Sequence, residues 1–346
     1  MDLFETTGIE DTQTPRDTLL LVDYSSFIYR TLHVARMQGD KREDYEALFY
    51  HYTLNTILGS MKMFNIKASN TLLCMDTKGK NWRSEVYPGF KADRKKNKKE
   101  DKFDWDEFFE IKENLDTILR ENTKFKIIAK EGIEADDIIY EISKQGDTIV
   151  LSDDKDMKQV LRHPRTQLYM PRSKKHIDAS DFSETGMVKH ILIGDKVDNI
   201  PSVKEETKFT EDFISFLKSE NIFFEDVYEV RNLEIYEHIK SKFLEISDKP
   251  IFKKGLFGEK TAEKVLFAEG KELKEFLSDP LSKEHYKRNE TLIDMEFIPQ
   301  EIKDIINEEY SKIINENKKL PMFGLQNWFV KNKLMTLNKN IGKFLV

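Results

Sequence analysis

Short apolar runs separated by helical patterns dominate the first two-thirds of the chain. Four of these runs are flanked by polar residues and have the length of buried strands, namely Leu19 to Val22, Leu72 to Met75, Phe125 to Ala129 and Thr148 to Leu151. Between them, apolar residues such as Tyr45, Leu48, Phe49 and Tyr52 recur at steps of three and four, the period of one helix face. This alternation predicts an α/β fold with a central, mainly parallel sheet flanked by helices.

Two stretches interrupt this pattern. Residues 81–105 have no apolar period, and seven Lys or Arg fall between Lys91 and Lys102, so we expect a basic arm there. Residues 204–250 are rich in acids and have the character of an insertion. The remainder is helical, with breaks expected at Pro280, Pro299 and Pro321. We therefore predict a flexible tail (1–12), an α/β core with its arm (13–203), the insertion (204–250) and a helical region (251–346).

Composition narrows the class of protein. The chain has 346 residues, enough for a sizeable core, and 34% of them are charged. It has no apolar run of about 18 residues and no secretory signal, so we expect a cytoplasmic protein without membrane contact. The one cysteine, Cys74, lies in an apolar run and fits a core position. The seven histidines lack the spacing of zinc ligands.

Aspartates follow three of the predicted strands. Asp23 and Asp76 come directly after apolar runs, and Asp154 and Asp156 follow the run that ends at Leu151. The carboxyl ends of parallel strands meet at one edge of a sheet, so we expect these side chains to converge. Two further acid-rich segments supply Glu134, Asp136 and Asp137, at the start of a helix, and Asp195 and Asp198, in Gly-Asp-Lys-Val-Asp-Asn.

So many carboxylates in one place would repel one another unless cations neutralised them. Oxygen ligands in this number suit Mg²⁺ or Mn²⁺, and two such ions can clamp both oxygens of a phosphoryl displacement. The pattern therefore favours phosphodiester hydrolysis. Each acid taken singly also fits a turn or a helix N-cap. Asp137 and Asp153 fit better as residues that support the metal ligands, or as solvated side chains, than as metal ligands themselves. The net charge of −7 does not argue against a nucleic-acid partner, because these acids account for it.

The basic arm offers cations to a phosphate backbone. Its spacing puts Lys91, Arg94, Lys95, Lys98 and Lys102 on one face if the segment is helical. Arg83 and Lys91 are candidates for stabilising the transition-state charge on a phosphate, and Tyr87 or Trp82 for stacking on a base. The alternative is a solvated charged surface with both aromatic rings packed at the base of the arm.

These motifs together resemble the 5′-nuclease family, which includes flap endonucleases, the 5′-nuclease domains of bacterial DNA polymerases and phage ribonucleases H. The resemblance spans about the first 270 residues, with a further likeness to the phage ribonucleases H near the C-terminal end. It is carried by Trp82-Arg83, Tyr87-Pro88-Gly89-Phe90-Lys91-Ala92-Asp93-Arg94, Glu134-Ala135-Asp136-Asp137, Ser152-Asp153-Asp154-Lys155-Asp156 and Gly194-Asp195-Lys196-Val197-Asp198-Asn199.

The resemblance implies a PIN-like 5′-nuclease fold and two Mg²⁺ ions, replaceable by Mn²⁺. Asp23, Asp76, Glu134, Asp136 and Asp154 would surround the first ion, and Asp156, Asp195 and Asp198 the second, with Arg83 and Lys91 assisting. It also implies 5′ to 3′ removal of RNA primers and cleavage of nicked duplexes, RNA–DNA hybrids and flaps.

Relatives grip duplex backbone with a helix-three-turn-helix motif. Here Gly255-Leu256-Phe257-Gly258 has one residue more between its glycines than the family pattern, and we expect Lys253, Lys254 and Lys260 to bind the duplex. The tail residues Leu3 and Phe4 resemble peptides that hold sliding clamps, although a disordered tail is the alternative. A single-stranded DNA-binding protein is another expected partner of this chain, which we expect to be a monomer.

Two rival functions remain open at this point. A non-catalytic protein that binds branched DNA would need lost metal ligands, and none is missing. A phosphatase with a nucleophilic Asp23 would need a second acid two residues on, where Ser25 stands.

Overall fold

The structure is a computed structural model that describes residues 17–39, 41–77, 79–92, 103–205, 208–225, 227–253, 257–267, 272–316 and 318–346. Within them the chain forms two compact units. Unit 1 comprises the described residues of 1–82, 97–182 and 298–346, and unit 2 comprises those of 83–96 and 183–297. Each unit is considered by itself below.

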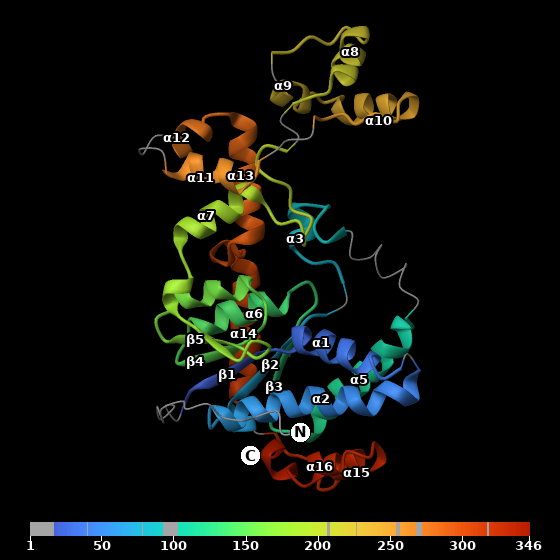
Figure 1. Ribbon diagram of the computed structural model, residues 1–346, viewed down its shortest axis with the longest axis vertical. Helices are drawn as coiled ribbons and strands as arrows, with labels where there is room; N and C mark the ends of the chain where they lie inside the picture. Colours follow the sequence, from blue (N-terminus) through green and yellow to red (C-terminus); the bar gives the residue numbers. More distant parts are fainter. Residues whose placement is uncertain are drawn as a thin grey trace. The chain divides into compact units, whose positions relative to one another are not determined.

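Unit 1 is built on a six-stranded sheet in the order β3-β2-β1-β4-β5-β6 (Figure 1). Its strands are β1 (Leu19–Asp23), β2 (Thr71–Met75), β3 (Lys126–Ala129), β4 (Thr148–Leu151), β5 (Thr166–Met170) and β6 (Lys175–Ile177). The first five pair in parallel, and only β6 is antiparallel to its neighbour. The fold class and the four strands predicted from apolar runs are confirmed. The sequence analysis missed β5 and β6.

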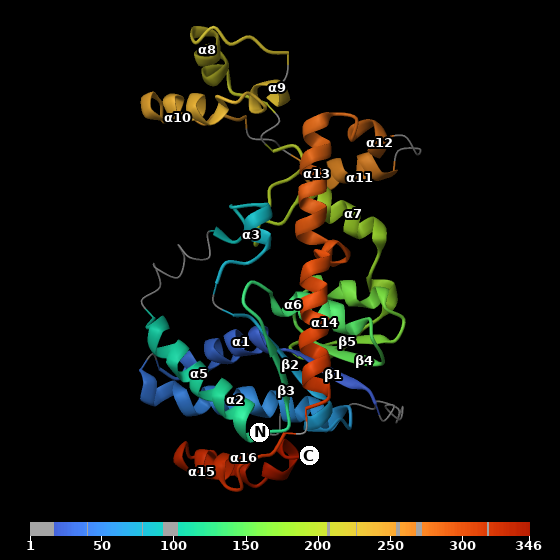
Figure 2. The ribbon, with the colours of Figure 1, turned by 180° about the vertical axis from the view of Figure 1, so that it is seen from behind.

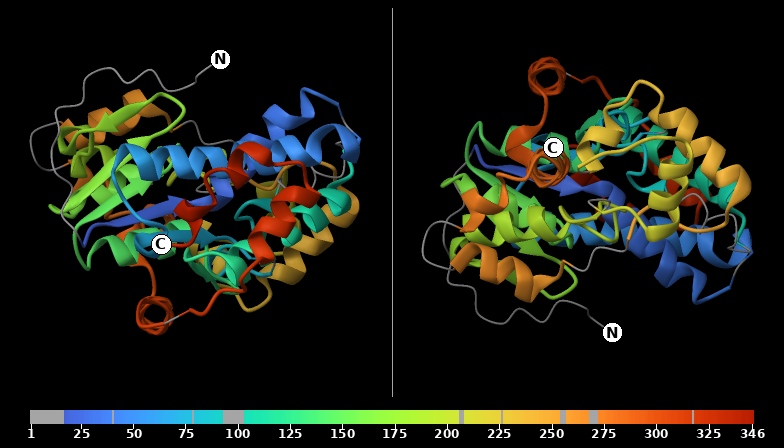
Figure 3. Two further views of the ribbon diagram at one scale, coloured as in Figure 1. Left: turned by 90° about the horizontal axis from the view of Figure 1, so that it is seen from below. Right: turned by 90° about the horizontal axis from the view of Figure 1, so that it is seen from above.

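Helices cover both faces of this sheet (Figure 3). The α-helices of unit 1 are α1 (Tyr24–Arg36), α2 (Arg42–Met63), α5 (Trp105–Asn122), α6 (Ala135–Ser143), α14 (Gln300–Ile314), α15 (Gly324–Lys331) and α16 (Met335–Asn338). Its 3-10 helices are η1 (Ala68–Asn70), η2 (Asp156–Arg162), η3 (Ala179–Asp181) and η5 (Ile341–Phe344). The main core lies between one face of the sheet and α1, α2 and α5, where α15 and α16 also pack. Helix α6 packs on β1, β2 and β4, and α14 lies against α6 and β3 (Figure 2).

Unit 2 is helical. Its α-helices are α3 (Arg83–Val86), α7 (Glu184–Ile193), α8 (Glu211–Ser219), α9 (Val227–Arg231), α10 (Tyr236–Ile246), α11 (Glu259–Phe267), α12 (Glu272–Phe276) and α13 (Pro280–Ile293), followed by the 3-10 helix η4 (Met295–Phe297). Helices α8 to α10 lie within the acidic segment and share an aromatic core centred on Phe213, which also includes Leu281 of α13.

Prolines mark helix starts in the C-terminal half, as the sequence predicts. Pro280 is the first residue of α13, Pro299 is the N-cap of α14, and Pro321 lies shortly before α15. The fixed φ of proline suits the first helical turn, where no N–H is needed. The helical character of the C-terminal region is confirmed, whereas the predicted domain boundaries stay predictions.

Candidate metal centre

Asp23 ends β1 and begins the site. Its Oδ1 caps α1 by accepting a hydrogen bond from the N–H of Ser26 at 3.0 Å, and its Oδ2 accepts one from the Ser152 hydroxyl at 2.6 Å. The side chain is almost fully buried. A strand that runs directly into a helix therefore fixes this carboxyl group, because the cap and the bond from the end of β4 hold both of its oxygens.

Burial raises the pKa of Asp23 to about 7. The hydrogen bonds from Ser152 and Ser26 act in the opposite direction, and the negative charges of Asp76 and Asp154 add to the rise. Burial also raises the pKa of the Cys74 thiol, and the charges of Asp23, Asp136 and Asp76 raise it further. Asp23, Asp76, Asp136 and Asp154 therefore act on one neighbourhood at the carboxyl ends of β1, β2 and β4. The predicted convergence of these strand-end acids agrees with this arrangement.

Asp76 joins the end of β2 to two helices. Its Oδ1 accepts a hydrogen bond from the N–H of Ala135, the first residue of α6, at 2.8 Å. Its own N–H donates to the hydroxyl of Ser25, in the first turn of α1, at 2.9 Å. A carboxylate at a helix N-terminus is stabilised by the free N–H groups there. The Asp76 side chain is exposed.

The start of α6 presents two acids and buries a third. Asp137 is fully buried, and its Oδ2 accepts hydrogen bonds from the Trp82 indole at 3.0 Å and from the N–H of Glu134 at 3.2 Å. Glu134 and Asp136 are only half-buried. Asp137 therefore faces inward and fixes the turn, which agrees with its predicted position behind the ligands. Trp82 packs at this turn, and this contact favours the structural alternative to base stacking.

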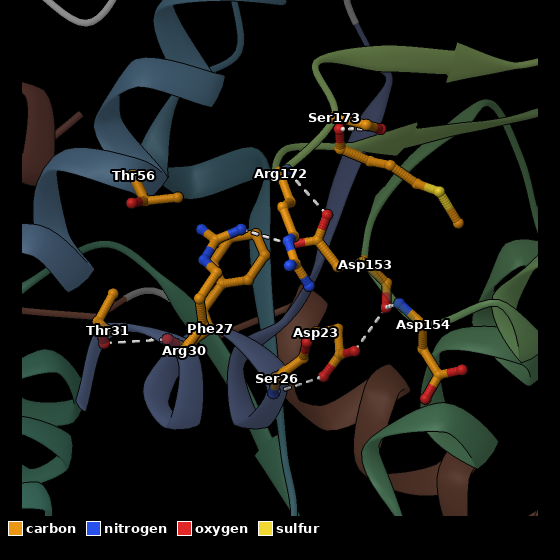
Figure 4. A network of polar contacts seen from close by, with 12 residues as sticks. Asp23, Ser26, Phe27, Arg30, Thr31, Thr56, Asp153, Asp154, Arg172 and Ser173 are labelled. Atoms are coloured by element: carbon orange, nitrogen blue, oxygen red, sulfur yellow. Dashed lines mark hydrogen bonds and ion pairs between the residues drawn. The ribbon is translucent and has the colours of Figure 1, made fainter. Parts of the chain in front are cut away.

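The loop after β4 is held by a chain of hydrogen bonds (Figure 4). The Ser152 hydroxyl accepts from the N–H of Asp154 at 3.0 Å, and Oδ1 of Asp154 accepts from the N–H of Asp156 at 2.9 Å. Asp153 points the other way. It forms an ion pair with Arg30 of α1 and accepts the N–H of Arg172, in the β5–β6 turn, at 2.8 Å. Asp153 thus anchors the loop while Asp154 stays exposed at the site.

Asp195 and Asp198 lie in unit 2, in the turn that follows α7. The turn is closed by reciprocal backbone hydrogen bonds between Asp195 and Ile200, at 2.9 and 2.6 Å. Gly194 precedes it with φ +75°, and a Cβ there would lie 2.4 Å from the Ile200 carbonyl oxygen, so only glycine fits. Backbone sterics therefore explain the glycine of this motif.

His190 is the main partner of Asp195. Its Nε2 lies 3.2 Å from Oδ2 of Asp195, and this hydrogen bond lowers the pKa of the carboxyl group to about 2, with help from the N–H groups of Asp198 and Val197. The sequence analysis did not select His190. The signal available to it was the placement of His190 in the last turn of a helix, five residues before an aspartate.

Lys91 is held beside Asp198. Its Nζ lies 3.6 Å from Oδ2 of Asp198, and its N–H donates to the Asp198 carbonyl at 2.8 Å. The Asn199 side chain donates to the Gly89 carbonyl at 2.8 Å, so the segment from Gly89 to Lys91 is attached to this turn at three points. Asp198, predicted as a metal ligand, and Lys91, predicted to stabilise charge on a phosphate, are thus paired within unit 2.

Arg83 and Tyr87 have different surroundings from those expected. Arg83 is only 4% exposed, and its Nε donates to the Leu292 carbonyl near the end of α13 at 3.1 Å. The guanidinium of Arg288 lies over the Tyr87 ring, 5.0 Å from its centre. Both side chains take part in the packing of unit 2, and their predicted roles at a phosphate and a base stay predictions.

The predicted duplex-binding lysines are described only in part. Lys253 is exposed and pairs with Glu211 at 2.6 Å, and Lys260 is exposed in the first turn of α11. The predicted residues that lie outside the described ones are Leu3, Phe4, Arg94, Lys95, Lys98, Lys102 and Lys254.

The carboxylates of unit 1 fit a divalent cation. All of the predicted ligands there offer oxygen atoms, which hard cations prefer. Burial and the neighbouring charges of Asp76 and Asp154 raise the pKa of Asp23, and a bound divalent ion would act in the opposite direction. The donor set and its electrostatics therefore support the use of divalent metal ions.

Family models and similar proteins identify the class of protein. Residues 18–187 match the 5′-3′ exonuclease N-terminal resolvase-like domain, and residues 257–344 match the T4 RNase H C-terminal domain. The ribonuclease H of Enterobacteria phage T4 is 26% identical over 342 residues, which cover 95% of this chain and 96% of that protein. A 5′-3′ exonuclease of Mycoplasmopsis pulmonis (strain UAB CTIP) is 28% identical over 149 residues, which cover 42% of this chain and 46% of that protein.

Solved structures from bacteriophage T5 share the fold. The T5 D15 protein crystallised with metal ions has a TM-score of 0.50 at 17% identity, and the match covers 86% of this chain and 100% of that one. The T5 D15 flap endonuclease in a complex with DNA and metal ions has a TM-score of 0.52 at 18% identity, with the same coverage. None of the described helices is both long and apolar enough to span a membrane.

The two family models together span most of the chain, and a ribonuclease H is similar to it over nearly the whole length of both proteins. The chain therefore belongs to the 5′-nuclease superfamily of 5′-3′ exonucleases, flap endonucleases and phage ribonucleases H, and it is a metal-dependent nuclease.

Proposed function

We propose that the chain hydrolyses phosphodiesters near the 5′ end of RNA–DNA hybrids, nicked duplexes and flaps, and that it removes RNA primers during DNA replication. The observation that carries the proposal is the placement of Asp23, Asp76 and Asp154 at or just after the carboxyl ends of three parallel strands, where the charges of Asp76 and Asp154 act on Asp23. A ribonuclease H and a flap endonuclease among the similar proteins support this range of substrates.

We assign the first of two Mg²⁺ positions to Asp23, Asp76, Glu134, Asp136 and Asp154, and the second to Asp156, Asp195 and Asp198. Bound Mg²⁺, or Mn²⁺ in its place, supplies charge stabilisation to the attacking and leaving oxygens of the displacement. The protein's own part is to hold these carboxylates in place. Ser152 and Ser26 fix Asp23, the start of α6 fixes Asp76, and Asp153 fixes the loop that carries Asp154.

Lys91 supports the transferred phosphate in this proposal. Its ammonium group is paired with Asp198, and a phosphate that approached Asp198 would meet this cation as well. Arg83 is assigned the same function, which requires a phosphate to reach a guanidinium that is nearly buried here.

The remaining assignments concern binding. Lys253, Lys254 and Lys260 would contact duplex backbone, and Tyr87, Arg94, Lys95 and Lys98 the strand at the arm. Leu3 and Phe4 would attach the chain to a sliding clamp, and a single-stranded DNA-binding protein would be a further partner of the monomeric enzyme. Phosphate contacts of this kind weaken as salt rises.

A cleavage assay on two substrates tests the proposal. A 5′-labelled flap and a nicked RNA–DNA hybrid are incubated with excess protein and Mg²⁺, beside the variant Asp154→Asn. We expect wild type to release short 5′ products from both substrates and the variant to be slower by at least about 100-fold, since a ligand that aids catalysis contributes several kcal/mol. Binding of both substrates without cleavage by wild type would instead support a non-catalytic junction-binding protein.

A further inference from the structure

A second pocket lies in unit 1, at the amino ends of β2 and β3 and therefore at the opposite end of these strands from Asp76. It has a volume of about 560 Å³, within the usual range for ligand pockets. Its walls come from η1, the end of α5, the start of β3 and the end of α14. None of the assignments made above uses it.

Cations dominate the charge of this pocket. Arg120, Lys124, Lys126 and Lys318 line it, and Glu316 is the acidic side chain among its lining residues. Among the described residues, no carboxylate forms a salt bridge with any of the four cations. Val346, the last residue of the sequence, also lines the pocket and brings its main-chain carboxylate. The ends of α5 and α14 together contribute about one further negative charge through their dipoles, so an excess of about one positive charge remains.

The cations also affect one another. Burial lowers the pKa of Lys318, and the neighbouring charges of Arg120 and Lys124 lower it further, against the effect of Glu316. Burial lowers the pKa of Lys126 as well. Arg120 donates to the Met75 sulfur at 3.8 Å, and Lys124 donates to the Lys318 carbonyl at 2.5 Å. These partners are neutral, so an entering anion would relieve repulsion that the protein itself leaves in place.

Apolar side chains form the rest of the wall. Ile313 and Ile314 line the pocket at the end of α14, and Ile314 is 38% exposed. Covering an exposed apolar side chain with another apolar group is favourable, because it removes apolar surface from water. The ligand should therefore carry both negative charge and a large apolar group.

The backbone of the pocket argues against a phosphate cradle. Such a cradle is built from free N–H groups. Here the N–H groups of Ser69, Asn70, Lys124 and Phe125 already donate, to Val346, Lys67, Phe344 and the Thr123 hydroxyl respectively. Binding must therefore rely on flexible side-chain cations and on the isoleucine wall. Carboxylates spaced along an extended peptide suit that arrangement better than a compact phosphate.

We propose that this pocket is a docking site for an acidic segment of a partner protein that carries a large apolar side chain. Binding would recruit the nuclease without occupying its carboxylate site, because the two lie at opposite ends of the same parallel strands. Charge complementarity selects the acidic peptide, and Ile313 and Ile314 receive its apolar residue.

A peptide-binding measurement tests this proposal. The probe is a fluorescein-labelled peptide of alternating aspartate and phenylalanine, titrated with the full chain in EDTA so that neither metal nor nucleic acid takes part. The variant Lys126→Gln/Lys318→Gln should bind about tenfold more weakly, as expected for the loss of charge-assisted contacts. Ile314→Ser should also weaken binding, and a peptide with asparagine in place of aspartate should not bind.

The matched control is Lys62→Gln/Lys339→Gln, which removes the same charge from exposed positions outside the pocket. It should bind the peptide as wild type does, and flap cleavage should be unchanged in all three variants. Equal weakening by the control would show that only net charge matters and would overturn the proposal. Displacement of the peptide by pyrophosphate or an oligonucleotide at equal or lower concentration would identify a phosphate site instead and would also overturn it.

Discussion

The hydroxyl of Ser152 connects two carboxylates of the metal centre. It donates to Asp23 and accepts from the N–H of Asp154, so one small side chain links the Asp23 carboxylate to the backbone that carries Asp154. A strand-end serine between an apolar run and an acid gives no such signal in the sequence. Acids at strand ends can be predicted from topology, whereas the groups that orient them depend on where side chains point.

Ser152→Ala should weaken metal binding. It removes the bond that orients Asp23 and leaves the N–H of Asp154 without its acceptor, and losing such an orienting contact costs about 10- to 100-fold in metal affinity. Calorimetric titration with Mn²⁺ measures the change. Ser311→Ala, at an exposed position on α14, is the control and should have wild-type affinity. Unchanged affinity in Ser152→Ala would exclude this role for the hydroxyl.

Asp153 and Arg30 should position the same loop without touching the metal. Asp153→Asn keeps the shape of the side chain but removes its charge, so the ion pair that anchors the loop carrying Asp154 to α1 is reduced to a neutral hydrogen bond. We expect kcat to fall by about tenfold with KM little changed, since a misplaced ligand affects the transition state more than substrate binding. Arg30→Lys should recover part of the activity that Arg30→Ala loses. Identical kinetics for those two variants would contradict a positioning role.

At the scale of elements, strands were predicted where the sequence holds an almost continuous apolar run. Strands β1 to β4 are apolar along nearly their whole length and could be found from the sequence. Strand β5 mixes Thr166 and Gln167 with apolar residues, and β6 is a short, largely exposed strand, so neither has a clear period. These two strands form because they pair with neighbouring strands in the folded sheet, and a local sequence pattern does not reveal such pairing.

His285 of α13 ties three segments of unit 2 together. Its Nδ1 lies 3.2 Å from the Val203 carbonyl, and its Nε2 lies 3.1 Å from Nη1 of Arg231 in α9. Nδ1–H therefore donates to the carbonyl and Nε2 accepts from the guanidinium, which requires a neutral ring. Burial, and then the charge of Arg288, lower the pKa of His285 to about 4.

This pKa predicts a loss of stability in mild acid. As pH falls through 6.5, the unfolded chain takes up a proton at His285 while the folded chain stays neutral down to about pH 4. The unfolded state thus binds more protons in this window, and the contribution to stability, about 3 kcal/mol at most, is present above pH 6.5 and is lost as pH falls.

His285→Gln should flatten this dependence, because glutamine does not titrate. The measurement is the urea midpoint for unfolding of the full chain, followed at pH 5 and pH 7.5 in both proteins. Wild type should lose more stability between these values than the variant. Equal losses would mean that His285 is not the responsible group.

At the scale of the whole molecule, the positions of the charged residues are more informative than the net charge of the chain. The chain carries a net charge of −7, yet its acids gather at strand ends and in the turn at Asp195, while cations occupy the arm and the second pocket. Net charge alone would have argued against a nucleic-acid enzyme. The position of each charge on an α/β sheet is the better guide, because parallel strands bring distant acids to one edge.

The most direct test of the account is the dependence of 5′-flap cleavage on Mg²⁺. Excess protein is mixed with a 5′-labelled flap in EDTA, and Mg²⁺ is then added stepwise while single-turnover rates are measured. We predict no cleavage in EDTA, a rate that rises and saturates with Mg²⁺, and a saturation point shifted to higher Mg²⁺ in Ser152→Ala. Cleavage that persists in EDTA, or a bound flap that stays intact at every Mg²⁺ concentration, would contradict it.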